Sequence, residues 1–142
     1  MNYSPKFFTL PELCHSEKAK ALGIVNVPCF SDIPKLLYLC EHVLDPLRQA
    51  WGKPLRVTSC FRTPELNDAI GGARGSQHMC TGAEAAVDLD PGGMEQVKAL
   101  AEIAKKTLLW DQLIVEGIGG GSWLHISTRM DGKNRLQVLN LK

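Results

Sequence analysis

Two histidines and a group of carboxylates in the second half of the chain are the residues best suited to metal binding or acid–base chemistry. A segment rich in small residues contains His78, Glu84, Asp88 and Asp90, and His125 follows further along the chain. Imidazole and carboxylate groups are usual protein ligands of zinc, and a catalytic zinc takes about three of them and leaves one position open for water. The residue types therefore indicate a possible metal site built from both parts of the chain.

Such a site would activate water. Zinc lowers the pKa of bound water to roughly 7 and polarises a carbonyl group, and a nearby carboxylate then transfers the water's proton to a leaving amine. The candidate residues are His78, Asp88, His125 and Glu116. Ordinary roles compete, since His125 can be a packed strand histidine and Asp88 can cap the next helix. Two histidines and one aspartate at long spacing form a weak motif, so the spacing alone leaves this choice open.

Hydrophobic patterns indicate the elements that must position these residues. Apolar residues at three-and-four spacing predict a helix over residues 33–50, which Pro46 should kink or split. A shorter helix is expected over residues 64–70 with Thr63 as its cap, and an amphipathic helix over residues 93–106. Strands are expected over residues 55–59, 85–89, 112–116, 123–128 and 136–141.

Turn signals complete this outline. Gly119-Gly120-Gly121 should join two strands as a hairpin, and Asp131-Gly132 predicts a second hairpin between the last two strands. Helices come early and hairpin strands late, which predicts an α+β fold with helices packed on a mostly antiparallel sheet. The length of 142 residues suits one domain that spans residues 1–142.

Composition narrows the class of protein. Sixteen basic and fifteen acidic residues give a net charge of +1, which argues against a broad nucleic-acid-binding surface. The chain shows neither a signal-peptide pattern nor an apolar run long enough to span a membrane. We expect a cytoplasmic monomer that has no membrane partner and that acts on the cell wall only if it is released. Five cysteines, an odd number without a C-x-x-C pair, favour a reducing compartment: Cys14, Cys29, Cys40, Cys60 and Cys80.

A family resemblance adds to this reading. From residue 8 to residue 128 the chain resembles the M15 peptidases, which are zinc D-Ala-D-Ala carboxypeptidases and related phage endolysins, and especially their short single-domain members. The matching stretches are "FTLPEL", "VLDPLRQAWGKPLRVTSCFRTPELNDAIGGARGSQH", "AVDLD", "DQLIVE" and "SWLHIS". The resemblance implies His78, Asp88 and His125 as zinc ligands. It also implies helices packed on one side of an antiparallel sheet, as in the hedgehog signalling domain.

The resemblance also implies how a substrate would be held. Arg62 ends an S-x-x-R element whose arginine binds the terminal carboxylate of the substrate in this family, and a guanidinium can grip a carboxylate with two parallel hydrogen bonds. Ser76 and Gln77 are expected to support the site and the substrate by hydrogen bonds. The implied substrate is a peptidoglycan stem peptide, which would be cleaved at or near a D-amino acid by a carboxypeptidase or an endopeptidase.

The first departure from the family pattern concerns the metal ligands. Nine residues lie between His78 and Asp88, an excess of three over the usual family spacing. The extra residues either bulge away from the site or displace Asp88 from the metal. In the second case Glu84, Asp90 or Cys80 becomes the third ligand. We assign Asp88 because "VDLD" best matches the register of the expected strand.

The second departure concerns the general base. Many family members carry a glutamate three residues before the last histidine, and here that position is Ser122. The nearest acid is Glu116, and the glycine hairpin should bring it back beside His125. We therefore assign the base role to Glu116. The main alternative is a non-catalytic zinc-binding or peptidoglycan-binding module of phage or cell-wall origin, which would bind metal without hydrolysis.

Overall fold

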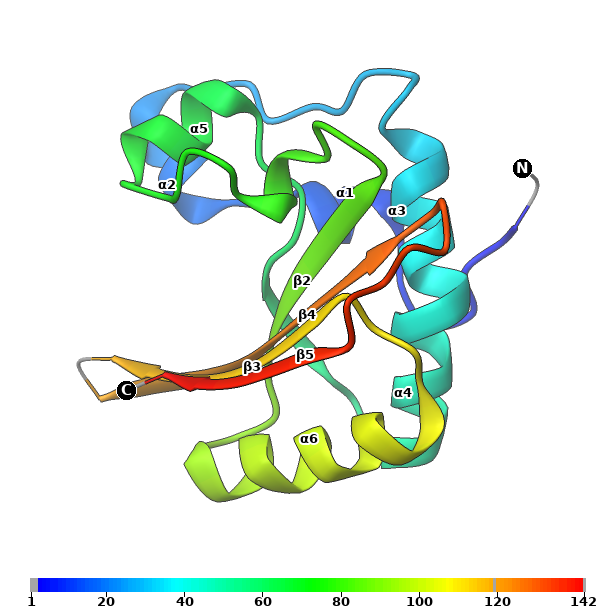
Figure 1. The fold of residues 1–142 in the computed structure, drawn as a ribbon. Coiled ribbons are helices and arrows are strands. Elements are labelled where there is room, and N and C mark those ends of the chain that lie inside the picture. Colours follow the sequence, from blue (N-terminus) through cyan, green and yellow to red (C-terminus); the bar gives the residue numbers. More distant parts are fainter. Residues whose placement is uncertain (1–2, 119, 142) are drawn as a thin grey trace.

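A five-stranded sheet forms the centre of the computed structural model, which describes residues 3–118 and 120–141 (Figure 1). The order of its strands is β1-β2-β4-β3-β5, and every neighbouring pair is antiparallel except β3 and β5. The strands are β1 (Arg56–Ser59), β2 (Glu84–Asp90), β3 (Gln112–Ile118), β4 (Gly121–Arg129) and β5 (Gln137–Leu141). The predicted α+β class with a mostly antiparallel sheet is therefore confirmed.

The helices expected over residues 33–50, 64–70 and 93–106 are present, together with shorter helices near the start of the chain. The α-helices are α1 (Leu10–Cys14), α2 (Glu17–Leu22), α3 (Ile33–Leu39), α4 (Asp45–Trp51), α5 (Pro64–Ala69) and α6 (Met94–Thr107). Two further turns are the π-helical η1 (Cys40–Leu44) and the 3₁₀-helical η2 (Gln77–Met79). Thr63 caps α5 as expected, because its side chain accepts a hydrogen bond from the backbone N–H of Leu66 at 3.2 Å.

Pro46 interrupts the long helix expected over residues 33–50. The segment forms as α3, η1 and α4 in direct succession, with the π-helical turn immediately before α4. The backbone N–H of Asp45 reaches back to the carbonyl of Cys40, five residues earlier, instead of four. Proline cannot donate a backbone hydrogen bond, so the wider turn before it relieves the break in the helical pattern. The predicted split is confirmed.

The two faces of the sheet have different compositions because side chains alternate along each strand. One face carries the apolar residues of the hydrophobic core, which are Val87, Leu89, Leu113, Val115, Leu124 and Ile126. Buried side chains of α3, η1, α4 and α6 complete this core, and Figure 1 shows α6 beneath the sheet with α3 and α4 along one side. The alternate positions carry Asp88 and His125, so the polar residues of interest lie on the opposite face.

The path of the last strand corrects one prediction. A turn does form at Asp131-Gly132, where the N–H of Gly132 donates to the carbonyl of Arg129 at 3.0 Å. The expected second hairpin was wrong, however, because β5 pairs in parallel with β3 rather than antiparallel with β4. Both edges of β4 are already paired, with β2 and with β3, so the chain passes on to the free edge of β3.

The glycine-rich connection joins β3 and β4, which pair as an antiparallel hairpin from Leu113 opposite Ile126 to Ile118 opposite Gly121. The prediction of this hairpin is confirmed, although Gly119 itself lies outside the described residues. The thiols of all five cysteines are free. Within residues 3–118 and 120–141, no helix has both the length and the apolar character needed to cross a membrane.

Candidate metal centre

His78, Asp88 and His125 converge on one point of the polar face of the sheet. One donor atom from each residue lies within 4.8 Å of the others, and all three residues are buried. His78 Nε2 lies 3.3 Å from Asp88 Oδ2, and His125 Nδ1 lies 3.0 Å from Asp88 Oδ1. The two imidazole rings meet edge to face, with their centroids 5.2 Å apart. The three residues that the sequence singled out therefore form one cluster.

Strand pairing explains why Asp88 meets His125. The two residues are register partners on β2 and β4, which places them side by side on the same face of the sheet. His78 reaches them from η2, the short turn that precedes β2. The chain between them turns sharply at Cys80, whose backbone adopts a left-handed conformation with φ of 55°. Despite the longer spacing from His78, Asp88 therefore lies in the cluster.

The orientation of the His78 ring is fixed by a backbone contact. His78 Nδ1 lies 2.7 Å from the carbonyl oxygen of Cys60, which can only accept a hydrogen bond. Nδ1 therefore donates a proton to this carbonyl, and Nε2 is the nitrogen that faces Asp88. The backbone is held as well, because the N–H of Arg62 donates to the carbonyl of His78 at 2.9 Å. Metal-binding histidines are usually oriented by such a contact at their second nitrogen.

The donor set fits a zinc ion. Tetrahedral zinc with ligand bonds of about 2.0–2.1 Å places neighbouring donor atoms roughly 3.3–3.4 Å apart. Each histidine nitrogen lies near that distance from one oxygen of the Asp88 carboxylate, His78 Nε2 at 3.3 Å from Oδ2 and His125 Nδ1 at 3.0 Å from Oδ1. Two imidazoles and one carboxylate also leave one of four positions open, as catalytic zinc sites do. His78, Asp88 and His125 are thus the residues that would hold the metal.

The alternative third ligands lie outside this cluster. Glu84 accepts hydrogen bonds from the turn at Thr81 and Gly82 and lies 3.7 Å from Arg129. Asp90 caps the next turn through the N–H of Gly92 and faces Arg56 at 3.7 Å. The thiol of Cys80 is buried and points to the carbonyl of His78, and burial raises the pKa of this thiol to about 12. A protonated thiol is a poor zinc ligand.

Electrostatics keep Asp88 in its charged form. Burial by itself raises the pKa of this carboxyl, but the imidazoles of His78 and His125 outweigh that effect and hold the pKa well below its usual range. The guanidinium of Arg62 adds a cation, with Nη2 3.6 Å from Asp88 Oδ2. Asp88 is therefore a carboxylate at neutral pH, which is the form that binds metal.

A cavity of about 550 Å³ opens over the cluster. Besides the three clustered residues, it is lined by Arg62, Ser76, Gln77, Glu116 and Trp123. All the residues that the sequence analysis assigned to the site therefore border a single pocket. Such a concave, partly apolar pocket with convergent polar groups is the usual form of a catalytic site.

Arg62 is held in the wall of this pocket by three contacts. Its Nε donates to Ser59 Oγ at 3.0 Å, its Nη1 donates to Asn67 Oδ1 at 3.1 Å, and its Nη2 faces Asp88. Only 14% of the side chain is exposed. Burial lowers the pKa of Arg62, while Asp88 and Glu116 favour its charged form. A fixed cation at the edge of the pocket suits a carboxylate or a carbonyl oxygen of a bound peptide.

Glu116 lies on β3, on the same face of the sheet as the cluster. It is two residues beyond Ile114, which pairs with His125. Ile114 is the register partner of His125, and Glu116 is the register partner of Trp123. The indole N–H of Trp123 donates to Glu116 Oε2 at 2.5 Å. The hairpin thus brings Glu116 back into the pocket near His125, and Trp123 fixes the position of its carboxylate.

Asp111 is a supporting residue that the sequence reasoning missed. Its side chain is fully buried and accepts hydrogen bonds from Gln77 Nε2 at 2.6 Å and from Arg135 Nη2 at 2.7 Å. It therefore ties the residue before His78 to the segment that leads into β5. Ser76 supports the same turn, since its Oγ accepts from the N–H of His78 at 3.3 Å. A signal for Asp111 exists in hindsight, because it opens the "DQLIVE" stretch directly before β3.

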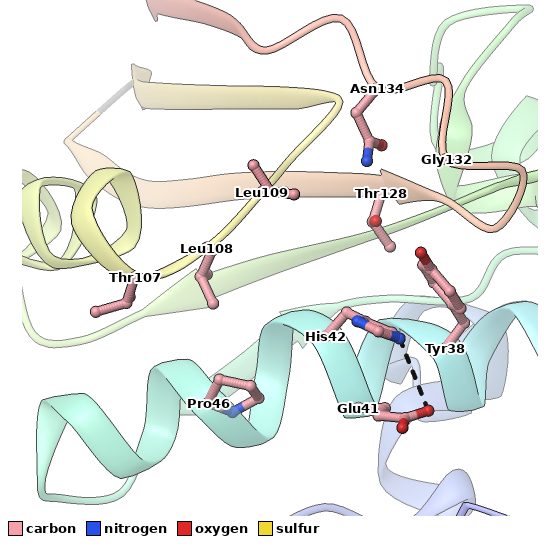
Figure 2. A pocket seen from close by; sticks show the side chains of 10 residues that line it. All are labelled: Tyr38, Glu41, His42, Pro46, Thr107, Leu108, Leu109, Thr128, Gly132 and Asn134. Carbon is pink, nitrogen blue, oxygen red and sulfur yellow. Dashed lines mark ion pairs between the residues drawn. The ribbon is translucent and has the colours of Figure 1, made fainter.

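A second hollow, of about 390 Å³, lies elsewhere and also contains a histidine and a carboxylate. Figure 2 shows His42 and Glu41 on the helical side of this hollow, with Thr128 and Asn134 facing them from β4 and the loop after it. His42 Nε2 and Glu41 Oε1 lie 3.8 Å apart, and both side chains are close to half exposed. In the described part of the chain, only His78, Asp88 and His125 form a group of three metal-type ligands.

Comparison with known proteins agrees with this geometry. A family model described as Peptidase M15 matches residues 6–127, a span that includes all the residues assigned to the pocket. A search of curated proteins finds no match to the chain. The match covers most of the sequence, and the clustered His-Asp-His set lies inside it. This chain therefore belongs to the peptidase M15 family.

Proposed function

We propose that this peptidase is a zinc metalloenzyme that hydrolyses peptidoglycan stem peptides at or near a D-amino acid. The observation that carries the proposal is the buried cluster of His78, Asp88 and His125, whose donor atoms all lie within 4.8 Å of one another. Membership of a peptidase family supports a peptide as the substrate. The choice of a stem peptide rests on the resemblance in the sequence and on Arg62 at the edge of the pocket.

The residues around the cluster divide the remaining work. A zinc ion held by His78, Asp88 and His125 would supply Lewis-acid activation of water and of the scissile carbonyl. Glu116 accepts a proton from the attacking water and delivers it to the nitrogen of the leaving amine. The carbonyl carbon gains the hydroxyl group as the C–N bond breaks, so one water molecule is consumed for each bond.

Arg62 and Trp123 position the reacting groups. Arg62 binds a carboxylate or carbonyl oxygen on the leaving-group side of the scissile bond, because its guanidinium is fixed by Ser59 and Asn67 and borders the pocket. Trp123 holds one oxygen of Glu116 through its indole N–H. The second oxygen of Glu116 then remains for proton transfer.

Metal content and hydrolysis test this function together. Protein purified without any chelator should contain about one zinc ion per chain, because the three protein ligands form one site with one coordination position left open for water. It should cleave a synthetic stem peptide, lose this activity with a chelator and regain it when zinc is restored. Folded protein without metal, purified from zinc-supplied medium, would contradict the proposal.

The non-catalytic module is the second candidate, and the serine at position 122 is the observation that favours it. Ser122 stands where many family members carry their glutamate, and it lies opposite Gly117 on the hairpin. This alternative predicts bound zinc and binding of the stem peptide without any cleavage. The same assay therefore separates the two functions.

A further inference from the structure

A third hollow, of about 460 Å³, adjoins the metal pocket. The two cavities share Arg62 and Ile70 in their walls, so Arg62 lies at the junction between them. The walls of this hollow come from β1, from the start of α2 with the residues before it, and from α5, and Figure 1 shows α2 and α5 together on one side of the molecule. The metal pocket and this hollow, called the groove below, are thus neighbours that meet at Arg62 and Ile70.

The floor of this groove is an open strand edge. β1 is the terminal strand of the sheet and pairs only with β2. Within residues 3–118 and 120–141, no backbone hydrogen bond joins the other edge of Arg56–Ser59 to any segment. All four consecutive residues of β1 line the hollow. Side chains alternate between faces, so a cavity that contacts every residue of a strand lies along its edge.

The groove carries an excess of positive charge. Its lining includes the cations Lys18, Arg56 and Arg62 and the single acid Glu17. Arg56 is 76% exposed and only 3.7 Å from Asp90, which is a weak surface pair. Lys18 is exposed and forms no ion pair with another described residue. This balance favours a bound segment that carries a carboxylate.

We propose that this groove binds the substrate on the carboxyl-terminal side of the scissile bond, as an extended strand paired with the open edge of β1. The inference rests on the proposed function, in which Arg62 holds the leaving-group side of the peptide. The chain of a carboxypeptidase substrate would end at Arg62, but the groove continues beyond it along four residues of β1, which span about 13 Å. The structure therefore assigns this enzyme to the endopeptidases, with a preference for an acidic residue beyond the cleaved bond.

The physical basis is strand addition. An exposed strand edge offers unpaired N–H and C=O groups, and an extended peptide can satisfy them with main-chain hydrogen bonds while neighbouring pockets select its side chains. Here the same groove supplies apolar contact from Val57, Phe61 and Leu66. The main-chain pairing would fix the register that brings one peptide bond to the metal cluster.

Substrate length provides the first test. Three peptides are compared. The first is a stem peptide, the second carries three added residues at its carboxyl end, and the third carries the same three residues at its amino end. One of the three added residues is Glu. We expect the carboxyl extension to raise kcat/KM about tenfold or more, and the amino extension to leave it nearly unchanged. Cleavage of all three peptides at equal kcat/KM would overturn the groove assignment and leave the proposed function intact.

Direct binding provides a second test that does not depend on turnover. A fluorescent form of the carboxyl-extended peptide is titrated against the Glu116→Gln variant, with and without zinc. Two further peptides carry N-methyl groups on alternate backbone nitrogens of the extension, one on the odd and one on the even positions. One of them should bind about tenfold more weakly and the other almost normally, because only every second N–H group of a strand faces its partner strand. Absence of binding, or equal affinity for both methylated forms, would overturn the inference whatever the outcome for hydrolysis.

Charge reversal identifies the groove itself. Lys18→Glu should remove most of the preference for Glu over Gln in the extension, measured as the ratio of the two kcat/KM values. Lys98→Glu is the matched control, because Lys98 is exposed on α6, which packs against the opposite face of the sheet. If both variants lost the preference for Glu equally, the effect would come from the net charge of the protein, and this would contradict a binding site for Glu in the groove.

Discussion

The metal pocket and the second hollow, which lies beside η1 and contains His42 and Glu41, both hold a histidine next to a carboxylate. The surroundings of the two pairs differ. In the metal pocket, His125 Nδ1 lies 3.0 Å from Asp88, and the side chains are 11% and 10% exposed. Beside η1, His42 and Glu41 lie 3.8 Å apart and are 48% and 40% exposed. The first pair is buried and fixed, whereas the second is a loose surface contact (Figure 2).

The difference comes from the neighbours of each pair. His78 is oriented by the carbonyl of Cys60, and Asp88 is the strand partner of His125. Besides its pair with Glu41, His42 contacts the ring of Tyr38 in the preceding helix α3, with ring centroids 4.1 Å apart. A site must be held by surrounding contacts before its residues can act at a defined geometry, and burial strengthens every charge interaction within it. Residue type alone therefore does not identify a catalytic site.

Removal of one clustered imidazole should have the largest effect. We expect His125→Ala to lower zinc affinity more than about a hundredfold, because loss of mere outer contacts already costs ten- to a hundredfold. The strand should still form, which circular dichroism will show. Competition with a zinc-binding dye measures the affinity, and His42→Ala is the matched control that should bind zinc normally. Full zinc occupancy in the His125 variant would make this residue a packing histidine.

Loss of the base should come next. Glu116→Gln keeps the shape of the side chain but removes its basicity, so the variant should bind zinc and lose roughly a hundred- to ten-thousand-fold in kcat. Glu84→Gln and Asp90→Asn are measured in parallel, and both should stay active. If Glu116→Gln remains active while one of these two fails, the base belongs to the segment after His78.

A smaller effect is expected from the support beneath the metal pocket. Burial raises the pKa of Asp111, but hydrogen bonds from Arg135 and Gln77 outweigh it and lower the pKa from 3.8 to about 2. A carboxyl group whose pKa is lower in the folded than in the unfolded state stabilises the fold at pH values above its unfolded-state pKa. For Asp111 this stabilisation is lost as the pH falls from about 4 to about 2.

Asp111→Asn should therefore lower the free energy of unfolding by about 2 kcal/mol at pH 7. The gap between variant and wild type should narrow as the pH approaches 2.5. Urea unfolding at pH 7, 4 and 2.5 measures both quantities. A gap that stays constant with pH would show that the charge of Asp111 contributes nothing and that only its shape matters.

The smallest effect is expected beside η1. Glu41→Gln should change the free energy of unfolding by less than about 0.5 kcal/mol, since an exposed pair of this kind contributes little. Peptide cleavage should be unaffected. A clear loss of activity in this variant would show that the hollow beside η1 is coupled to the metal pocket, and the contrast between the two regions would fail.

Local pattern was enough to predict much of this molecule. The alternation of residues along β2 and β4 places Asp88 and His125 on one face, and the helix pattern with Pro46 predicts the split at η1. The path of β5 was not predictable in this way. Asp131-Gly132 specifies a turn, but whether the next strand meets β4 or β3 depends on which edge is still free in the assembled sheet.

The same limit applies to the candidate site. The motifs around His78 and His125 indicated the cluster. The "DQLIVE" stretch marks Asp111, but it does not show that Asp111 bonds to Gln77, which lies 34 positions away in the sequence. The spacing between His78 and Asp88 allowed two outcomes, and the pairing of β2 with β4, which sets Asp88 beside His125, decides between them. The chemical roles of Glu116 and Arg62 stay predictions.

The parallel pairing of β5 has a consequence for the order of assembly. β3 and β4 meet through a tight hairpin, but Gln112 pairs with Gln137, and the chain must pass β4 before this contact forms. Loop closure costs more entropy for the longer path, so we expect the hairpin to form early and β5 to dock late. Until β5 docks, the edge of β3 beside Leu113 and Val115 is exposed and can pair with another chain. Slow docking of this one strand would therefore appear as aggregation during refolding at high protein concentration.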